Sequence, residues 1–186
     1  MSVDAFNTAF AQTIGLEGKF SNDEKDPGNW TGGAVNKGEL KGTMYGISAS
    51  AYPTLDIAGL GLPKVKSIYQ SDYWDKMKCD TMPDIVAIAL FKEAVNMGVT
   101  GAAKALQRSL RITPVDGVIG QVTIGYATST APKTVLEQFL TECAYTYTQM
   151  ETFNTYGKGW LSRVIQTAVE AQLSPEEMAG QNGVRP

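Results

Sequence analysis

The first residues of the chain carry an apolar stripe with the period of an α-helix. Its positions are spaced by three, four and four residues, at Val3, Phe6, Phe10 and Ile14. This spacing puts them on one face of a helix, which we predict over residues 2–17. The next position on that face is Glu17, where an apolar residue would be expected.

Glu17 has two interpretations. A carboxylate on an apolar face has its charged form disfavoured and its pKa raised, which suits a general acid working near neutral pH. A Glu near the end of a helix can equally extend into solvent, and Gly18 is a plausible end for this helix.

Residues 18–47 form a long polar stretch rich in glycine. A connection of this length without regular structure is uncommon in a compact domain unless it is functional. We expect short hairpin strands around residues 19–22 and 43–47, with a weaker candidate at Val35.

From residue 60 onward the apolar positions recur with helical spacing. We predict a helix that starts near Pro63, a helix capped by Asp84 and ending near Gly98, and another capped by Thr100. Further helices are expected over residues 122–128 and 133–150, then a break at residues 156–159, and a last helix from Trp160. Helices with a small separate β element near the start predict an α+β fold that is mostly α.

Length and composition limit the class of protein. The chain has 186 residues, 43% of them hydrophobic, which fits one domain or one domain with a small appendage. It contains no apolar run of about 18 residues, so we expect no membrane insertion. The N-terminus also lacks the basic and apolar regions of a secretory signal, so we expect synthesis in a cytoplasm.

Histidine is absent from the sequence, which excludes His-based acid–base catalysis and most zinc sites. The two cysteines, Cys79 and Cys143, fit no metal-ligand spacing and are expected as small buried side chains. We therefore expect no cofactor and no metal, and carboxylates become the leading acid–base groups. The net charge is −3, and the modestly basic residues 64–111 are too weakly charged to predict nucleic-acid binding.

A second carboxylate, Asp26, follows Glu17 after eight intervening residues. A hairpin between them would bring the two carboxylates together, as glycosidic bond hydrolysis requires. Asp23 and Glu24 are rivals for the second role, and a loose calcium loop is a weaker alternative without EF-hand spacing. For Asp26 alone, a turn position before Pro-Gly is a sufficient explanation.

These segments resemble glycoside hydrolase family 108, the lysozyme-like N-acetylmuramidases common as bacteriophage endolysins. The resemblance rests first on residues 17–23 (EGKFSND), residues 26–28 (DPG) and residues 42–48 (GTMYGIS). It continues at residues 68–75 (IYQSDYWD) and 90–98 (LFKEAVNMG). Residues 106–110 and 115–120, with Thr123, resemble the small helical peptidoglycan-binding module that follows in the family, and residues 159–164 resemble the family's C-terminal helix.

The resemblance implies a lysozyme-like fold and a division into three parts. Residues 1–98 would form the catalytic region, residues 99–173 a helical peptidoglycan-binding-like region packed on it, and residues 174–186 a flexible tail. The substrate would be the glycan strands of bacterial peptidoglycan, cleaved by a monomer between N-acetylmuramic acid and N-acetylglucosamine. A separate pore-forming protein would release the enzyme to the cell wall.

The resemblance also implies roles for individual residues. The catalytic Glu of the family falls on Glu17, with Asp26 as its partner. A water-positioning hydroxyl falls on Thr43 or on its competitor Thr31, and Thr43 is favoured because it lies in the Thr-x-Tyr-Gly-Ile segment. Four residues are substrate-binding candidates: Asn22, Trp30, Tyr45 and Asn96.

The sequence departs from the family pattern at three places. Lys19 and Phe20 replace Gly-Tyr after the acid, Lys92 stands where the family often has Asp, and residues 31–41 resemble an insertion that could reshape one wall of the cleft. Two other functions remain open: a lytic transglycosylase, which needs one Glu, and a non-catalytic peptidoglycan-binding or secretion-assisting protein.

Overall fold

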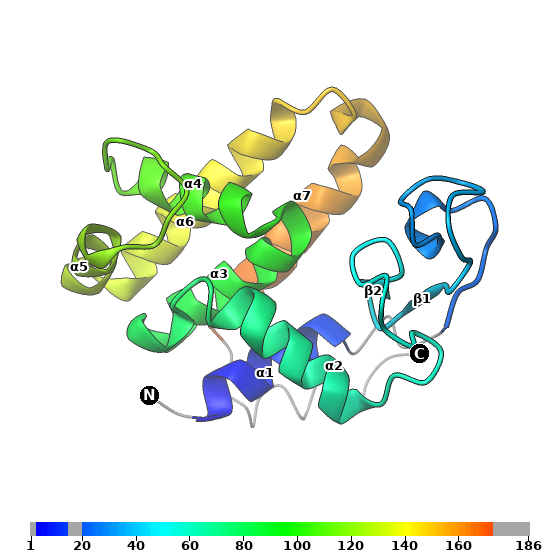
Figure 1. Cartoon of the computed structure of the whole chain (residues 1–186). Coiled ribbons are helices and arrows are strands. Elements are labelled where there is room, and N and C mark those ends of the chain that lie inside the picture. The colour runs from blue at the N-terminus through cyan, green and yellow to red at the C-terminus, as the bar shows by residue number, and fades with distance from the viewer. Residues whose placement is uncertain (1–2, 15–19, 173–186) are drawn as a thin grey trace, which may run out of the picture. The chain divides into compact units, whose positions relative to one another are not determined.

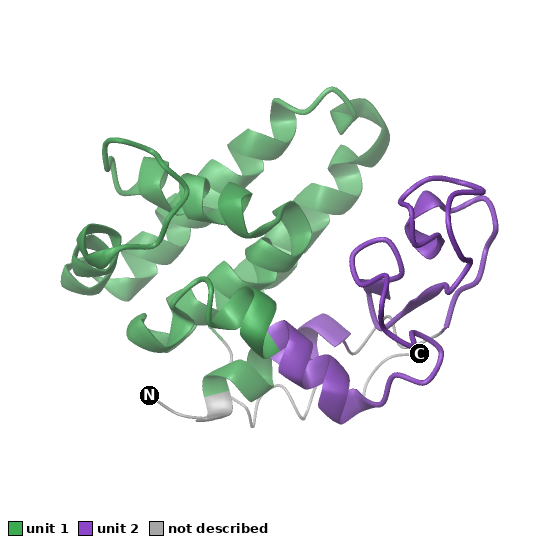
Figure 2. Ribbon diagram, in the orientation of Figure 1, with its two compact units in different colours: residues 1–9, 70–186 green, residues 10–69 purple. Residues whose placement is uncertain are grey.

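The computed structural model describes residues 3–14 and 20–172. It divides into two compact units, one formed by residues 10–69 and the other by residues 1–9 and 70–186 (Figure 2). Figure 1 shows the elements of each unit. The predicted functional boundary between residues 98 and 99 is a different division and stays a prediction.

Helix α1 (Val3–Ile14) contributes its first turns to one unit and its last turns to the other. In the larger unit, the buried Phe6 packs its ring against Trp74 and Phe91 at centroid distances of 5.3 and 5.8 Å. In the smaller unit, Phe10 makes an edge contact with Tyr69. The apolar stripe is thus used for packing, whereas its predicted continuation to Glu17 lies outside the described residues.

The unit of residues 10–69 is mostly loop, held by a short 3-10 turn, a small sheet and one helix. These are η1 (Pro27–Asn29), β1 (Thr43–Met44), β2 (Ile47–Ser48) and α2 (Leu62–Tyr69). Strands β1 and β2 pair antiparallel, with Thr43 opposite Ser48. The predicted strand over residues 43–47 is therefore split in two.

A two-residue turn causes this split. Tyr45 and Gly46 have φ values of 50° and 73°, and two successive positive values are typical of the type I′ hairpin turn. Ser21 forms an isolated bridge with Thr43, which accounts for part of the strand expected at residues 19–22. The weaker prediction at Val35 is wrong, because that residue lies in an exposed turn.

The larger unit is helical. Its short elements are η2 (Gln70–Trp74) and η3 (Cys79–Thr81), and its long helices are α3 (Asp84–Met97), α4 (Val99–Ser109), α5 (Gln121–Ser129), α6 (Pro132–Thr148) and α7 (Phe153–Glu170). Helix α3 contacts α4, α6 and α7, and every residue from Val86 to Ala94 is buried. A helix buried on all sides is the centre of a bundle.

Three predictions about helix ends are wrong. Pro83, not Asp84, occupies the N-cap position of α3, and Asp84 is the first residue of the helix. Gly98, not Thr100, occupies the N-cap position of α4, and its φ of 83° lets the chain turn between α3 and α4 with no intervening loop. The break expected at residues 156–159 does not occur, because α7 runs through it. The glycines at this point did not stop the helix because one of them, Gly157, is buried against the ring of Phe153.

The two cysteines are confirmed as buried side chains, each with no exposed surface, and burial raises the pKa of both thiols. Within the described residues, no helix combines the length and the apolar composition needed to cross a bilayer.

Candidate active site

The carboxylate predicted as the acid, Glu17, lies outside the described residues. The structure resumes at Phe20, and Ser21 is fixed to β1 by two backbone hydrogen bonds with Thr43, both of 2.9 Å. The segment that follows Glu17 is therefore attached to the strand that carries the candidate hydroxyl.

Asp26 begins the 3-10 turn η1. It has an extended backbone, and its Oδ1 accepts a hydrogen bond of 2.8 Å from the amide of Gly28. Its side chain is exposed. This is the turn position that Asp-Pro-Gly predicts, and it uses one of the several acceptor positions of the carboxylate. The remaining positions are free to face substrate or water.

The other acidic residues of the loop are exposed. Asp23 Oδ1 accepts from the amide of Lys25 at 3.0 Å, which ties the carboxylate to its own turn. The carbonyl of Glu24 accepts the indole N–H of Trp30 at 2.9 Å, so the Trp30 ring is anchored to the loop. Across residues 3–14 and 20–172, no three His, Cys, Asp or Glu side chains are grouped so that they could hold a metal ion.

The sequence analysis missed Asn29, the buried polar centre of this region. Its side chain is fully buried, donates to the carbonyl of Asp23 at 3.0 Å, and accepts the hydroxyl of Thr43 at 2.7 Å. Its own carbonyl accepts the amides of Lys41 and Gly42. The Asn29 side chain thus connects the acidic loop to the candidate hydroxyl, and the Asn29 backbone carbonyl holds the segment before β1.

The two candidate threonines differ in their surroundings. Thr31 Oγ1 accepts the amide of Glu39 at 2.9 Å and closes the loop of residues 31–41. Thr43 is half-buried and directs its proton at Asn29, which leaves its oxygen lone pairs available to accept a hydrogen bond. The geometry therefore favours Thr43 for a water-positioning role.

Tyr45 and Asn96 belong to different units. The carbonyl of Tyr45 accepts the hydroxyl of Tyr69 at 3.0 Å, which fixes the hairpin turn to α2, and the Tyr45 side chain is half-buried. Asn96 lies in the last turn of α3, and its side chain is hydrogen-bonded to the carboxyl of Glu93.

Glu93 is a second feature that the sequence analysis missed. It is fully buried, and its carboxyl oxygens accept the hydroxyls of Tyr147 at 3.0 Å and Thr167 at 3.5 Å. Burial raises the pKa of Glu93, and these hydrogen bonds and the charge of Lys92 oppose that shift. The signal in the sequence was a Glu inside the apolar run of α3.

Lys92, which departs from the family pattern, is also buried and forms an ion pair with Glu170 of α7. Its side chain therefore joins two helices of the bundle.

The Asp116-Gly117 turn of the helical region is organised by the buried Gln107. Its side-chain N–H₂ donates to Asp116 Oδ1 at 2.6 Å and its oxygen accepts the amide of Gly117 at 2.8 Å. The hydrogen bond from Gln107 lowers the pKa of Asp116. These hydrogen bonds fix the turn of the chain between α4 and α5.

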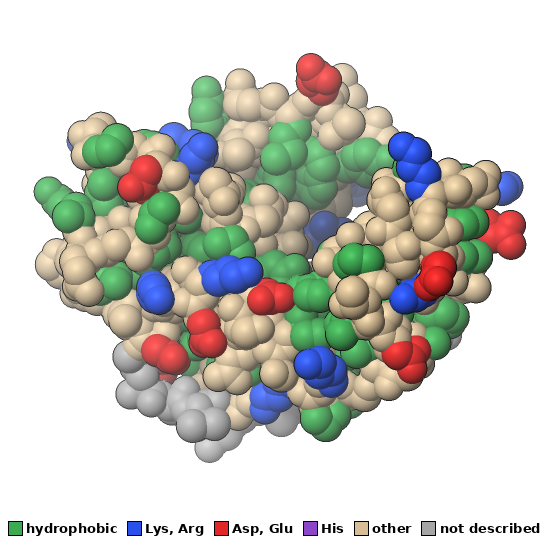
Figure 3. All heavy atoms as spheres, viewed as in Figure 1, with side chains coloured by type: hydrophobic (Ala, Val, Ile, Leu, Met, Phe, Trp, Pro, Cys, Tyr) green, Lys and Arg blue, Asp and Glu red, His purple; other side chains and the backbone are tan. Residues whose placement is uncertain are grey.

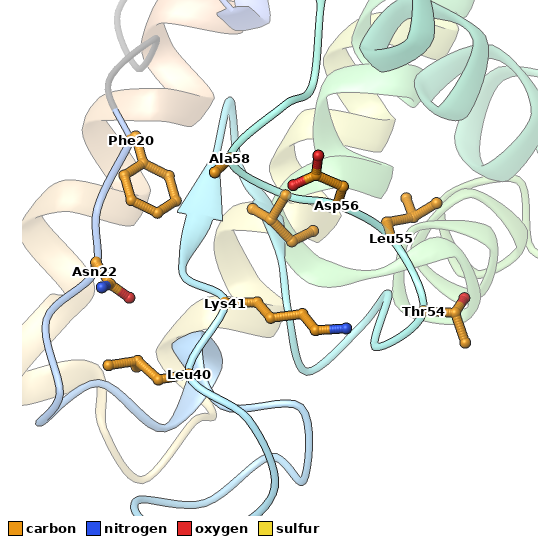
Figure 4. Close-up of a pocket in the computed structure, with 9 residues that line it drawn as sticks. Phe20, Asn22, Leu40, Lys41, Thr54, Leu55, Asp56 and Ala58 are labelled. Atoms are coloured by element: carbon orange, nitrogen blue, oxygen red, sulfur yellow. The ribbon is translucent and has the colours of Figure 1, made fainter.

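Asn22 is placed at a pocket of about 390 Å³ within the smaller unit (Figure 4). The pocket is lined by residues from three segments: Phe20, Asn22, Leu40, Lys41, Thr54, Leu55, Asp56, Ile57 and Ala58. On the molecular face in Figure 3, basic and acidic side chains are interspersed and neither sign forms a continuous patch.

Comparison with known proteins shows that part of the chain is similar to a glycoside hydrolase family. Residues 10–98 match the family described as Glycosyl hydrolase 108, and all seven candidate site residues fall inside the match. This match supports glycoside hydrolase activity.

One similar solved structure is titled "Structure of Brucella abortus SagA". It has a TM-score of 0.75 and 27% sequence identity, and the alignment covers 91% of this chain and 95% of that one. No curated protein matches the chain. The similarity and the elements above confirm the predicted α+β, mostly α fold class with a small β-hairpin region near the N-terminus.

Proposed function

We propose that the chain is a peptidoglycan hydrolase that cleaves the glycosidic bond between N-acetylmuramic acid and N-acetylglucosamine. The observation that carries the proposal is the match of residues 10–98 to a glycoside hydrolase family, with Glu17 and Asp26 at the positions that the sequence motifs assign. An origin as a bacteriophage endolysin, with release through a separate pore, is part of the same proposal.

In the proposed mechanism, Glu17 protonates the oxygen of the leaving sugar. Asp26 stabilises the positive charge that develops on the other sugar ring or orients the attacking water. Thr43 accepts a hydrogen bond from that water, because its own proton is directed at Asn29. Asp26 lies on one loop and Thr43 on one strand, and the Asn29 side chain joins that loop to that strand.

The first test is the variant Glu17→Gln, which keeps the shape of the side chain and removes the acid. We expect turnover of purified peptidoglycan to fall by at least ~100-fold, as removal of a general acid does. The matched control is Glu151→Gln, which neutralises an exposed carboxylate in the turn between α6 and α7. Full activity of a folded Glu17→Gln protein would contradict the mechanism.

The second test separates the charge of Asp26 from its role in the turn. Asn caps helical turns about as well as Asp, so Asp26→Asn should leave the thermal unfolding midpoint nearly unchanged. We expect turnover to fall by roughly tenfold or more, because a fixed charge near the reacting bond is lost. Retention of most activity would transfer the role to Asp23 or to no second carboxylate.

A lytic transglycosylase is the second candidate, and one observation favours it. Asp26 is exposed and already serves as a turn cap, and a transglycosylase cleaves the same bond without a second carboxylate. The products distinguish the two, since a transglycosylase leaves 1,6-anhydro ends and a hydrolase leaves reducing ends.

A further inference from the structure

The pocket of Figure 4 lies entirely within the unit of residues 10–69. Two of its walls are close in the sequence to residues proposed for catalysis, because Phe20 comes three residues after Glu17 and Lys41 comes two residues before Thr43. The hydrogen bonds between Ser21 and Thr43 hold these two walls together. The pocket is therefore adjacent in the chain to the residues proposed for catalysis.

The polar groups of the pocket carry both signs of charge. Lys41 extends across the opening toward the segment of Thr54 and Leu55 (Figure 4), and its ammonium donates to the carbonyl of Pro53 at 2.9 Å. Asp56 lines the pocket from that segment, and the exposed amide of Asn22 lines it from the other side.

Lys41 retains the capacity to bind an anion. An ammonium has three N–H donors, and Pro53 accepts one while Glu39 lies 3.2 Å away as an ion-pair partner. The Glu39 side chain is 75% exposed, and such exposed pairs contribute little, so a ligand carboxylate can share or replace it.

Of the remaining lining residues, Thr54 is polar and five are apolar: Phe20, Leu40, Leu55, Ile57 and Ala58. A ligand that fits has short aliphatic groups, a carboxylate, an amine and peptide groups. A neutral N-acetylated sugar carries no charge to pair with Lys41 and Asp56. The volume lies in the range of about 300–1,000 Å³ that is usual for ligand sites.

We propose that this pocket binds the short peptide attached to the glycan of peptidoglycan. The peptide offers alanine methyl groups to the apolar wall, carboxylates to Lys41, and an amine to Asp56. The inference rests on the proposed function, which supplies the polymer, and it adds a preference for glycan that carries peptides. It also gives the loop of residues 31–41 a role, because Leu40 and Lys41 stand at its end.

The first experiment measures binding directly and does not depend on catalysis. The probe is the free tetrapeptide L-Ala-γ-D-Glu-meso-diaminopimelic acid-D-Ala, titrated into the full chain by calorimetry. We expect saturable binding that Lys41→Gln weakens about tenfold, as loss of a hydrogen bond to a charged group does. Lys37→Gln, an exposed lysine of the same loop that does not line the pocket, should bind as the wild type does.

Because Lys41→Gln also removes the bond to Pro53, Asn22→Ala serves as a second variant. Its side chain is exposed, so we expect an unchanged unfolding midpoint together with weaker binding. Absence of wild-type binding at millimolar peptide, or an equal loss in Lys37→Gln, would overturn the inference.

The second experiment compares cleavage of glycan strands with and without their peptides. We expect Lys41→Gln to raise KM only on strands that carry peptides, with kcat unchanged. Equal effects on both substrates, or none, would overturn the inference and leave the proposed function intact. If the wild type cleaves neither substrate, the proposed function fails, and the tetrapeptide titration alone decides whether the pocket binds peptide.

Discussion

At the scale of single residues, Asn29 determines the geometry of the candidate site. A buried amide must satisfy its donors and its acceptor, and Asn29 does so with the Asp23 carbonyl and the Thr43 hydroxyl. The arrangement fixes the direction of the Thr43 proton. A fully buried residue thereby sets what the Thr43 oxygen can accept.

We expect the side chains of Asn29 and Thr43 to be energetically coupled. Asn29→Ala leaves the Asp23 carbonyl and the Thr43 hydroxyl without this partner, so the free energy of unfolding should fall by about 1–3 kcal/mol. Thr43→Val removes the same hydrogen bond from the other side. Urea unfolding of both single variants and the double variant should show a coupling of about 1 kcal/mol. Strictly additive losses would show that the hydrogen bond does not matter in solution.

The sequence indicated the local structure around Asp26 and Thr43 better than it indicated the hydrogen-bond partners of the candidate residues. Asp26 lies at the turn that Asp-Pro-Gly indicates, and Thr43 lies in a strand as expected. Asn29 could not be found, because its role depends on Asp23 and Thr43, and Thr43 is fourteen residues away. Glu93 carried a signal as a Glu inside an apolar run, but its partners Tyr147 and Thr167 lie on other helices and could not be predicted.

At the scale of elements, helical periodicity predicted the positions of helices well and their ends less well. The helices α3, α5 and α6 begin and end within about two residues of the prediction. Two of the three errors concern glycine. Gly98 ends one helix and begins the next, whereas the glycines of α7 are simply included in it. Whether a glycine interrupts a helix depends on packing around it, which the local sequence does not record.

Gly98 provides a test of backbone strain without a steric clash. A Cβ at this position would meet no atom within 4 Å, but its φ of 83° is unfavourable for an L-residue. We expect Gly98→Ala to lower the free energy of unfolding by about 1–2 kcal/mol. Urea unfolding at neutral pH provides the measurement.

Gly120 is the matched control, because it too has open space around its Cβ position but has a φ of −102°. Both glycines are N-cap residues, so the poorer N-cap preference of Ala affects both variants, but Gly120→Ala should be clearly less destabilised because Ala is compatible with its backbone. Equal destabilisation of both variants would contradict the role assigned to the Gly98 conformation.

At the scale of the whole molecule, the chain combines a loop-rich unit with a helical unit whose centre contains a carboxyl group. Glu93 joins α3 to α6 and α7 through Tyr147 and Thr167, and the neighbouring Lys92 joins α3 to α7 through Glu170. Losing one partner of a buried hydrogen bond lowers the free energy of unfolding by more than the complete bond contributes to it. The protonation of Glu93 therefore affects the stability of the helical unit.

We expect the stability of the protein to depend on pH through Glu93. Its pKa in the folded state is raised above the ordinary 4.5, mainly by burial, so the folded state retains the proton at pH values where the unfolded chain has lost it. This contribution is complete below the ordinary pKa and is lost as the pH rises through the raised value. Stability from this group thus falls with increasing pH.

Glu93→Gln isolates the effect, because glutamine keeps the shape and carries no charge. The free energy of unfolding of Glu93→Gln relative to the wild type should rise as the pH increases above 4.5 and level off once Glu93 has ionised in the folded wild type, measured by urea unfolding at several pH values up to pH 8. A difference that stays constant or decreases over this range would show that burial does not raise the pKa of Glu93 in solution.

The most direct test of the central claim is mass spectrometry of the fragments released from purified peptidoglycan by the wild-type protein. We expect disaccharide fragments that end in reducing N-acetylmuramic acid and are essentially absent from the Glu17→Gln digest. Fragments with 1,6-anhydro ends, or no cleavage of the glycan, would contradict it.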